Sequence, residues 1–185
     1  MTLRRFLPPA SAANPGPAAA TDDHDTETVR RIAGQLDALP IDRARFLAAF
    51  AYILMRAAAA DLEISDVEAR VIEDLVAEHG GLPSAQAVLV AQMAKSQSLL
   101  YGGTEDYLVT RQFRDLSTDE DRIALLRCCY LVGAADDNIT VEESDTLQEI
   151  ATELDIERHA VNAIRDEFAP KLSAMKALLR FRGEA

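Results

Sequence analysis

The chain has 185 residues, of which 49% are hydrophobic and only 5% aromatic, and its formal net charge is −12. An acidic surface repels phosphate backbones, so we expect no nucleic-acid partner, and the charge favours cations, basic surfaces and other proteins. No run of about 18 apolar residues exists, which excludes a membrane-spanning helix. Abundant Ala and Leu with few Gly favour packed helices over sheets.

The start of the chain does not resemble a secretion signal. Arg4 and Arg5 are followed by only two apolar residues before Pro8-Pro9, which leaves no room for the apolar core of a signal peptide. We therefore expect a cytoplasmic protein. Residues 1–20 are predicted to form a disordered arm, because prolines and small residues follow one another there without an apolar period.

The first half of the chain predicts four helices. Thr21 opens the first, and Pro40 ends it; the second runs from about Asp42 to Ala60 with apolar residues at three- and four-residue steps. The third ends at His79-Gly80-Gly81, a glycine C-cap pattern. Pro83 and Ser84 start the fourth, and a loop is expected from Leu99 to Thr104. Apolar residues of the fourth helix include Val88, Leu89, Ala91 and Met93.

The second half predicts a similar series. A short helix is expected from Glu105 to Phe113, and Ser117 with Glu120 fits a capping box that opens the next helix. After a further helix, Glu157 to Phe168 corresponds to the fourth helix of the first half, and Pro170 then interrupts the chain. The last segment, from Leu172 to Phe181, is basic in an otherwise acidic sequence.

A short acidic turn occurs twice, 75 residues apart. The first copy spans residues 60–68 and the second spans residues 135–143, and Ala, Asp, Ile and Glu are identical at four matched positions. Each copy lies between two apolar helical stretches. The repeat predicts an all-α fold: a single bundle of about seven to nine helices over residues 21–185, built from two similar three-helix halves at about 42–100 and 118–169 that share one core.

Part of each turn is explained by helix capping. Ser65 with Glu68, and Thr140 with Glu143, have the spacing of a capping box, in which the hydroxyl and the carboxylate each accept a hydrogen bond from a backbone N–H. Asp61 and Asp136 are not explained in this way, because both follow a helix C-terminus, where the helix dipole disfavours negative charge. This local conflict favours a functional hypothesis for the turns.

The oxygen atoms of the two turns suit a hard divalent cation, Ca²⁺ or Mg²⁺, which binds about six to eight oxygen ligands or about six. An ordinary EF-hand is excluded, because alanine or valine occupies the first ligand positions and the turn glycine is missing. A site shared by the two copies remains, and the alternative is that these acids are solvated caps. The predicted metal ligands are Asp61, Glu63, Glu68, Asp136, Asn138 and Glu143.

Both copies resemble the Ala-Asp-Gly-x-Ile-x-x-x-Glu signature of TerB-like domains, which occur in tellurite-resistance proteins and at the N-terminus of DjlA-type co-chaperones. The resemblance covers about Asp42 to Phe168. It implies an all-α, duplicated module of the cytoplasm, with metal binding through these acids and a role in the response to stress or tellurite. The chain departs from the signature at its Gly, which is Leu62 in the first copy and Asp137 in the second.

We expect no enzymatic activity. His24, His79 and His159 have no ligand spacing, and neither a nucleophile elbow, a phosphate loop nor a Cys–His pair is evident. The adjacent Cys128 and Cys129 are expected to be buried, reduced thiols, because neighbouring cysteines form a strained ring; a redox- or metalloid-reactive pair would need a lowered thiol pKa.

The alternative to a metal-binding module is a protein-interaction scaffold in which the acids serve only as caps and surface charge. The basic segment from Lys171 to Arg182 is expected to close the core, or else to dock on an acidic surface or a membrane. Membrane contact is not expected through any other part of the chain.

Overall fold

The computed structural model describes residues 38–61, 64–101 and 103–183. The predicted arm at residues 1–20, nearly all of the predicted helix before Pro40, and Glu63 lie outside the described residues. The described part of the chain contains only helices and one isolated β-bridge, which confirms the predicted all-α class. The elements are α2 (Ile41–Ala58), η2 (Ala59–Asp61), α3 (Asp66–Gly80), α4 (Ser84–Tyr101), α5 (Asp106–Leu116), α6 (Asp119–Gly133), α7 (Val141–Glu153), α8 (Arg158–Glu167), η3 (Ala169–Lys171) and α9 (Ser173–Gly183).

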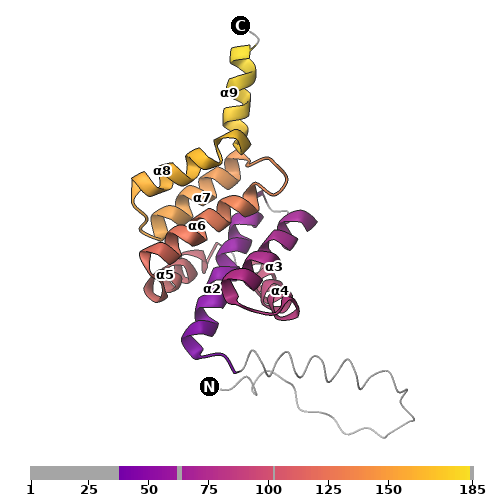
Figure 1. Ribbon diagram of the computed structural model, residues 1–185, viewed down its shortest axis with the longest axis vertical. Coiled ribbons are helices and arrows are strands. Elements are labelled where there is room, and N and C mark those ends of the chain that lie inside the picture. Colours follow the sequence, from indigo (N-terminus) through magenta and orange to yellow (C-terminus); the bar gives the residue numbers. More distant parts are fainter. Residues whose placement is uncertain (1–37, 62–63, 102, 184–185) are drawn as a thin grey trace, which may run out of the picture. The chain divides into compact units, whose positions relative to one another are not determined.

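Helix α2 is the centre of the core. It contacts α3 and α4 of its own half, the intervening α5, and α6 and α7 of the second half (Figure 1). From Ala49 to Ala58 every residue except Arg56 is buried, because neighbours surround this part of the helix. The two halves, α2–α3–α4 and α6–α7–α8, follow the predicted order of helix, turn, helix, break and helix, and they share one apolar cluster.

Helix α4 differs from its prediction. Its buried residues are Gln86, Ala87, Ala91 and Ala94, so of the predicted apolar residues only Ala91 is buried, whereas Val88, Leu89 and Met93 are exposed. Small side chains let α4 approach α2 and α3 closely, so alanines face inward and the larger residues face outward. The helix also continues to Tyr101, so the loop predicted to begin at Leu99 starts after it.

The other helix boundaries follow local signals in the sequence. Gly81 ends α3 in a left-handed conformation with φ 59°, as the glycine C-cap pattern predicts. The cap of α6 lies one residue later than predicted: Thr118 and Asp121 form the capping box in place of Ser117 and Glu120. None of the described helices combines the length and apolarity needed to cross a lipid bilayer.

Candidate functional site

The second acidic turn connects α6 to α7 through a backbone bend at Asp137. Asp137 has a φ of 68°, in the left-handed region that favours glycine, and its N–H donates to the carbonyl of Ala134 at 3.0 Å. The Oδ1 atom of Asp136 accepts a hydrogen bond from the N–H of Asn138 at 2.9 Å. These bonds fix an Asx turn. The Asp that conflicts with the helix dipole therefore shapes the turn.

Both predicted capping boxes in the repeated turns are confirmed. The N–H of Thr140 donates to Glu143 Oε2 at 2.7 Å, and the N–H of Glu143 donates to the Thr140 hydroxyl at 3.1 Å. Ser65 and Glu68 make the same pair of bonds at 2.8 and 3.2 Å. Glu68 is 8% exposed and Glu143 4% exposed, so both carboxylates lie inside the fold and hold helix starts.

Glu143 packs against the helix that precedes the turn. A Cβ atom added to Gly133 would lie 3.6 Å from Glu143 Oε1, an ordinary van der Waals distance, so the carboxylate lies directly against the last residue of α6. Ile139 of the same turn is fully buried, and its counterpart Ile64 is partly buried against the core. The second turn is therefore anchored in the core at Ile139 and Glu143, while Asp136 and Asp137 remain exposed.

Two lysines from the C-terminal segment contact the exposed part of this turn. The ammonium group of Lys171 contacts the Asp137 carboxylate, and that of Lys176 contacts the Asp137 carbonyl. Lys176 also donates to Asn138 Oδ1 at 3.3 Å. Three oxygen atoms of two adjacent residues thus accept from two cationic groups. The sequence indicated a basic C-terminal segment, but it could not indicate which acids the lysines meet.

The predicted shared metal site is only partly described. Asp61 is the last residue of η2, but its side chain and all of Glu63 lie outside the described part. The η2 turn contacts α7 of the other half. Among the side chains that the structure describes, no three His, Cys, Asp or Glu residues gather as a metal ion would require. The oxygens of the second turn that face cations include a backbone carbonyl and an amide, which calcium accepts alongside carboxylates.

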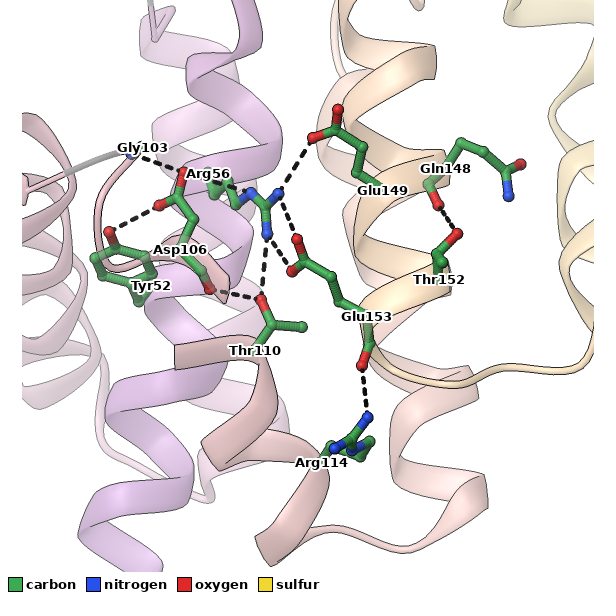
Figure 2. A network of polar contacts seen from close by, with 10 residues as sticks. All are labelled: Tyr52, Arg56, Gly103, Asp106, Thr110, Arg114, Gln148, Glu149, Thr152 and Glu153. Carbon is green, nitrogen blue, oxygen red and sulfur yellow. Dashed lines mark hydrogen bonds and ion pairs between the residues drawn. The ribbon is translucent and has the colours of Figure 1, made fainter. Parts of the chain in front are cut away.

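A second polar cluster surrounds Arg56, which interrupts the buried surface of α2 (Figure 2). Its guanidinium donates to Glu153 of α7 at 2.6 and 3.1 Å, and it lies 3.6 Å from the Asp106 carboxylate of α5. It also donates to Glu149 at 3.3 Å and to Thr110 at 3.2 Å. Burial acts to lower the pKa of Arg56, but the carboxylates outweigh it and raise this pKa. One cation therefore joins helices from both halves and the segment between them.

The cluster extends on the α5 side to Tyr52. The Tyr52 hydroxyl donates to Asp106 Oδ1 at 2.9 Å, and the N–H of Gly103 donates to Asp106 Oδ2 at 2.9 Å (Figure 2). Burial and the hydrogen bond to Asp106 raise the pKa of Tyr52. Asp106 is the first residue of α5, and its contacts with Tyr52 and Arg56 hold the start of α5 against α2. These contacts have a structural role.

The two cysteines are free and buried, as predicted. The prediction that no Cys–His pair exists is wrong, because Cys128 Sγ lies 3.4 Å from Nε2 of His79, which is 49 residues away in sequence. However, burial and the nearby Glu78 raise the pKa of the Cys128 thiol to about 11, and burial also raises that of Cys129. Neither thiol therefore has the lowered pKa that a reactive cysteine needs.

An open depression of about 380 Å³ lies between α7 and α8. It is lined by amide, hydroxyl and charged side chains, including Gln148, Thr152, Asp155 and Arg158, together with a few apolar residues. No His or Cys lines it. The Thr152 hydroxyl donates to the Gln148 carbonyl at 2.8 Å, within helix α7.

These features define a class of protein: a helical domain with an internal repeat, in which each half opens its second helix with a capped acidic turn. The family model described as "Tellurite resistance protein TerB" matches residues 46–166, well over half of the chain, and the chain belongs to this family. No curated protein and no solved structure matches it.

Proposed function

We propose that this TerB-family protein is a non-enzymatic, cytoplasmic module that binds a divalent cation, Ca²⁺ or Mg²⁺, and acts in the response to stress or tellurite. The observation that carries the proposal is the second acidic turn, where oxygen atoms of Asp137 and Asn138 already receive the ammonium groups of Lys171 and Lys176. Oxygens arranged for a cation of one kind are candidates for another. The link to tellurite rests on the family description, and the link to stress rests on the resemblance of the two turns to TerB-like domains.

The residues of the second turn offer the ligand types that hard cations take. Asp136 and Asp137 supply carboxylates, Asp137 also supplies a carbonyl, and Asn138 supplies an amide oxygen. The cap hydrogen bonds of Glu68 and Glu143 favour a structural role for these two predicted ligands. Asp61 and Glu63 of the first turn would complete a shared site. A bound cation would supply charge neutralisation and rigidity to the turns.

The proposal is tested by thermal unfolding and calorimetric titration with Ca²⁺ and with Mg²⁺. A cation at about 100 times its dissociation constant should stabilise the fold by about 2.7 kcal/mol. Asp136→Asn with Asp137→Asn should abolish this gain, and Asp61→Asn tests the share of the first turn. The matched control is Asp155→Asn, because Asp155 is also an aspartate at positive φ but lies between α7 and α8. Absence of any stabilisation at millimolar cation would overturn the proposal.

A protein-interaction scaffold is the second candidate. It is favoured by the exposed apolar residues at the end of α4 and the start of α5, where Leu99 and Leu100 are each 70% exposed. Helix α4 contains no acidic residue, so this helix adds no charge repulsion against a second copy of this acidic chain. Sedimentation at increasing concentration tests this candidate, since Leu99→Ser with Leu100→Ser should remove any self-association.

A further inference from the structure

We propose that helix α9 joins two copies of this chain into a dimer, in which the α9 helix of each copy lies over the depression between α7 and α8 of the other copy. The inference goes beyond the proposed function, because it requires neither a cation at the acidic turns nor the exposed apolar residues of α4. Each copy would supply one helix and one depression, so the same contact would be made twice about a two-fold axis.

Helix α9 has apolar side chains that the described part of its own chain leaves exposed. Its main packing partner is the short helix η3, and in Figure 1 it extends away from the other helices. Met175 and Leu178 are three residues apart, which places them on one side of the helix, and they are 38% and 48% exposed. The sequence favoured a role for this segment in closing the core, but α9 leaves these side chains open to a partner.

The start of α9 is anchored, so the helix is held in a defined direction. The N–H of Ile139 donates to the carbonyl of Lys171 at 2.9 Å, and the N–H of Ser173 donates to the carbonyl of Ile139 at 2.9 Å, which forms a parallel β-bridge between Ile139 and Leu172. Leu172 is 4% exposed and Ile139 is fully buried. Because α9 is already helical and fixed at one end, its docking on a partner costs little conformational entropy.

The charge of α9 is opposite to that of the surface on which we place it. Residues 141–168, which include α7 and α8, contain nine acidic and two basic residues, a formal net charge of −7, whereas residues 169–183 contain four basic residues and no acid. Four of the nine acids pair within the fold, namely Glu143, Glu149, Glu153 and Glu167. The other five still outnumber the two basic residues. Contacts between α9 and this surface therefore offset the repulsion between two chains that each carry −12.

The depression between α7 and α8 has the composition of a binding surface. Its volume is about 380 Å³, and its apolar lining consists of the buried Ala151 and Val161 and the partly buried Ile156. Exposed polar and charged side chains surround this lining. An apolar centre with a polar rim is typical of protein interfaces. Since α9 extends away from α7 and α8 of its own chain, this surface is left to a second copy.

The test is sedimentation velocity of the full chain at increasing concentration, with a chelator present so that cation binding plays no part. The α9 variant is Met175→Ser/Leu178→Ser. The depression variant is Gln148→Arg/Asn162→Arg, which places positive charge where the basic helix would dock. Both variants change exposed side chains, and each should raise the dissociation constant of the dimer about tenfold or more. High ionic strength should weaken the wild-type dimer as well.

A mixture of the two variants tests whether the contact is reciprocal. The α9 variant keeps an intact depression and the depression variant keeps an intact α9, so an equimolar mixture can form one of the two contacts. The mixture should therefore associate more strongly than either variant alone. The matched control is Leu99→Ser/Leu100→Ser, which removes two exposed apolar residues from α4 and should leave the dissociation constant unchanged.

Four results would overturn the proposal. The first is a wild type that stays monomeric at every concentration, and the second is a mixture that associates no better than its components. The third is a dimer that the α4 control dissociates and the α9 variant keeps, which would place the interface on α4. The fourth is a monomeric chain whose α9 binds phosphatidylglycerol vesicles, which would make a lipid surface the partner. None of these results bears on cation binding by the acidic turns.

Discussion

At the scale of single residues, Asp137 accounts for a departure from the family signature. The signature has Gly at this position, and the backbone adopts a φ of 68° that glycine enters without steric cost. Aspartate is among the few other residues that tolerate this region. Its carboxylate also contacts Lys171. The chain therefore has a residue that is less favourable for the backbone, and it gains a charged contact with Lys171 of η3.

This interpretation predicts the order of two substitutions. Asp137→Gly and Asp137→Ala both lose the carboxylate. At the positive φ of this position alanine has a steric cost that glycine lacks, so the glycine variant should be more stable by about 1 kcal/mol. Urea unfolding measures the difference. At Asp136, where φ is not positive, the order should reverse by about 0.5 kcal/mol in favour of alanine. The same order at both positions would contradict the role of the backbone.

At the scale of helices, Arg56 is the main polar link. Its side chain is 9% exposed, and the carboxylates of Asp106 and Glu153 are 20% and 18% exposed. A cation in such a position compensates acids that have lost most of their water. The ion pair of Arg127 and Glu167 also joins two helices, α6 and α8, but both of its side chains are about half exposed.

The two ion pairs should differ in what their removal costs. Arg56→Met leaves two largely buried carboxylates without a counter-charge and should lower the free energy of unfolding by about 3 kcal/mol. Arg127→Met removes an exposed, bidentate contact and should cost about 1 kcal/mol or less. Chemical denaturation of both variants measures these costs. Equal costs would mean that Arg56 is not the link between the helices.

At the scale of the whole molecule, the titratable groups with raised pKa values determine how stability depends on alkaline pH. Burial raises the pKa of Cys128 from 9.0 to about 11 and raises those of Cys129, Tyr52 and Tyr130 as well. Between pH 9 and 11 the unfolded chain releases the Cys128 proton while the folded chain keeps it. The thiol therefore stabilises the fold fully below pH 9, and this stabilisation is lost as the pH rises toward 11.

The free energy of unfolding should accordingly fall as the pH is raised above about 9, by up to about 1.4 kcal/mol per pH unit for each buried thiol. Cys128→Ala with Cys129→Ala should make the decline less steep, although the variant starts from a lower stability. Unfolding curves recorded from pH 8 to 11 check this slope. A slope that is identical in the wild type and the variant would exclude the thiols as its cause.

Much of the architecture was predictable because its signals are local. The capping boxes at Ser65 and Thr140 and the buried cysteines follow from spacing and composition within one or two turns. Helix α4 has apolar residues on several sides, so the periodicity did not indicate which face is buried. Because α2 packs closely against α4, the alanines form the buried face. At the start of α6, Ser117 and Thr118 each have an acid three residues later, so both fit the N-cap position and the sequence could not distinguish between them.

The candidate site was less predictable, because its contacts are distant in sequence. Lys171 and Lys176 meet the second turn across 34 to 39 residues, and His79 meets Cys128 across 49. Such contacts depend on how the helices pack, and no local pattern specifies them. Glu68 and Glu143 cap helices α3 and α7, as the sequence indicated. The oxygen atoms that accept from the lysine ammonium groups belong to Asp137 and Asn138.

The two copies of the repeat have different structural roles. Leu131 stands 75 residues after Arg56, at the matching place in the second half, and is 43% exposed. The first half thus provides the inward cation, Arg56, that pairs with Asp106, Glu149 and Glu153, and the second half provides the outward turn that receives lysines. A protein assembled from two copies of either half would lack one of these partners, so the halves are no longer interchangeable.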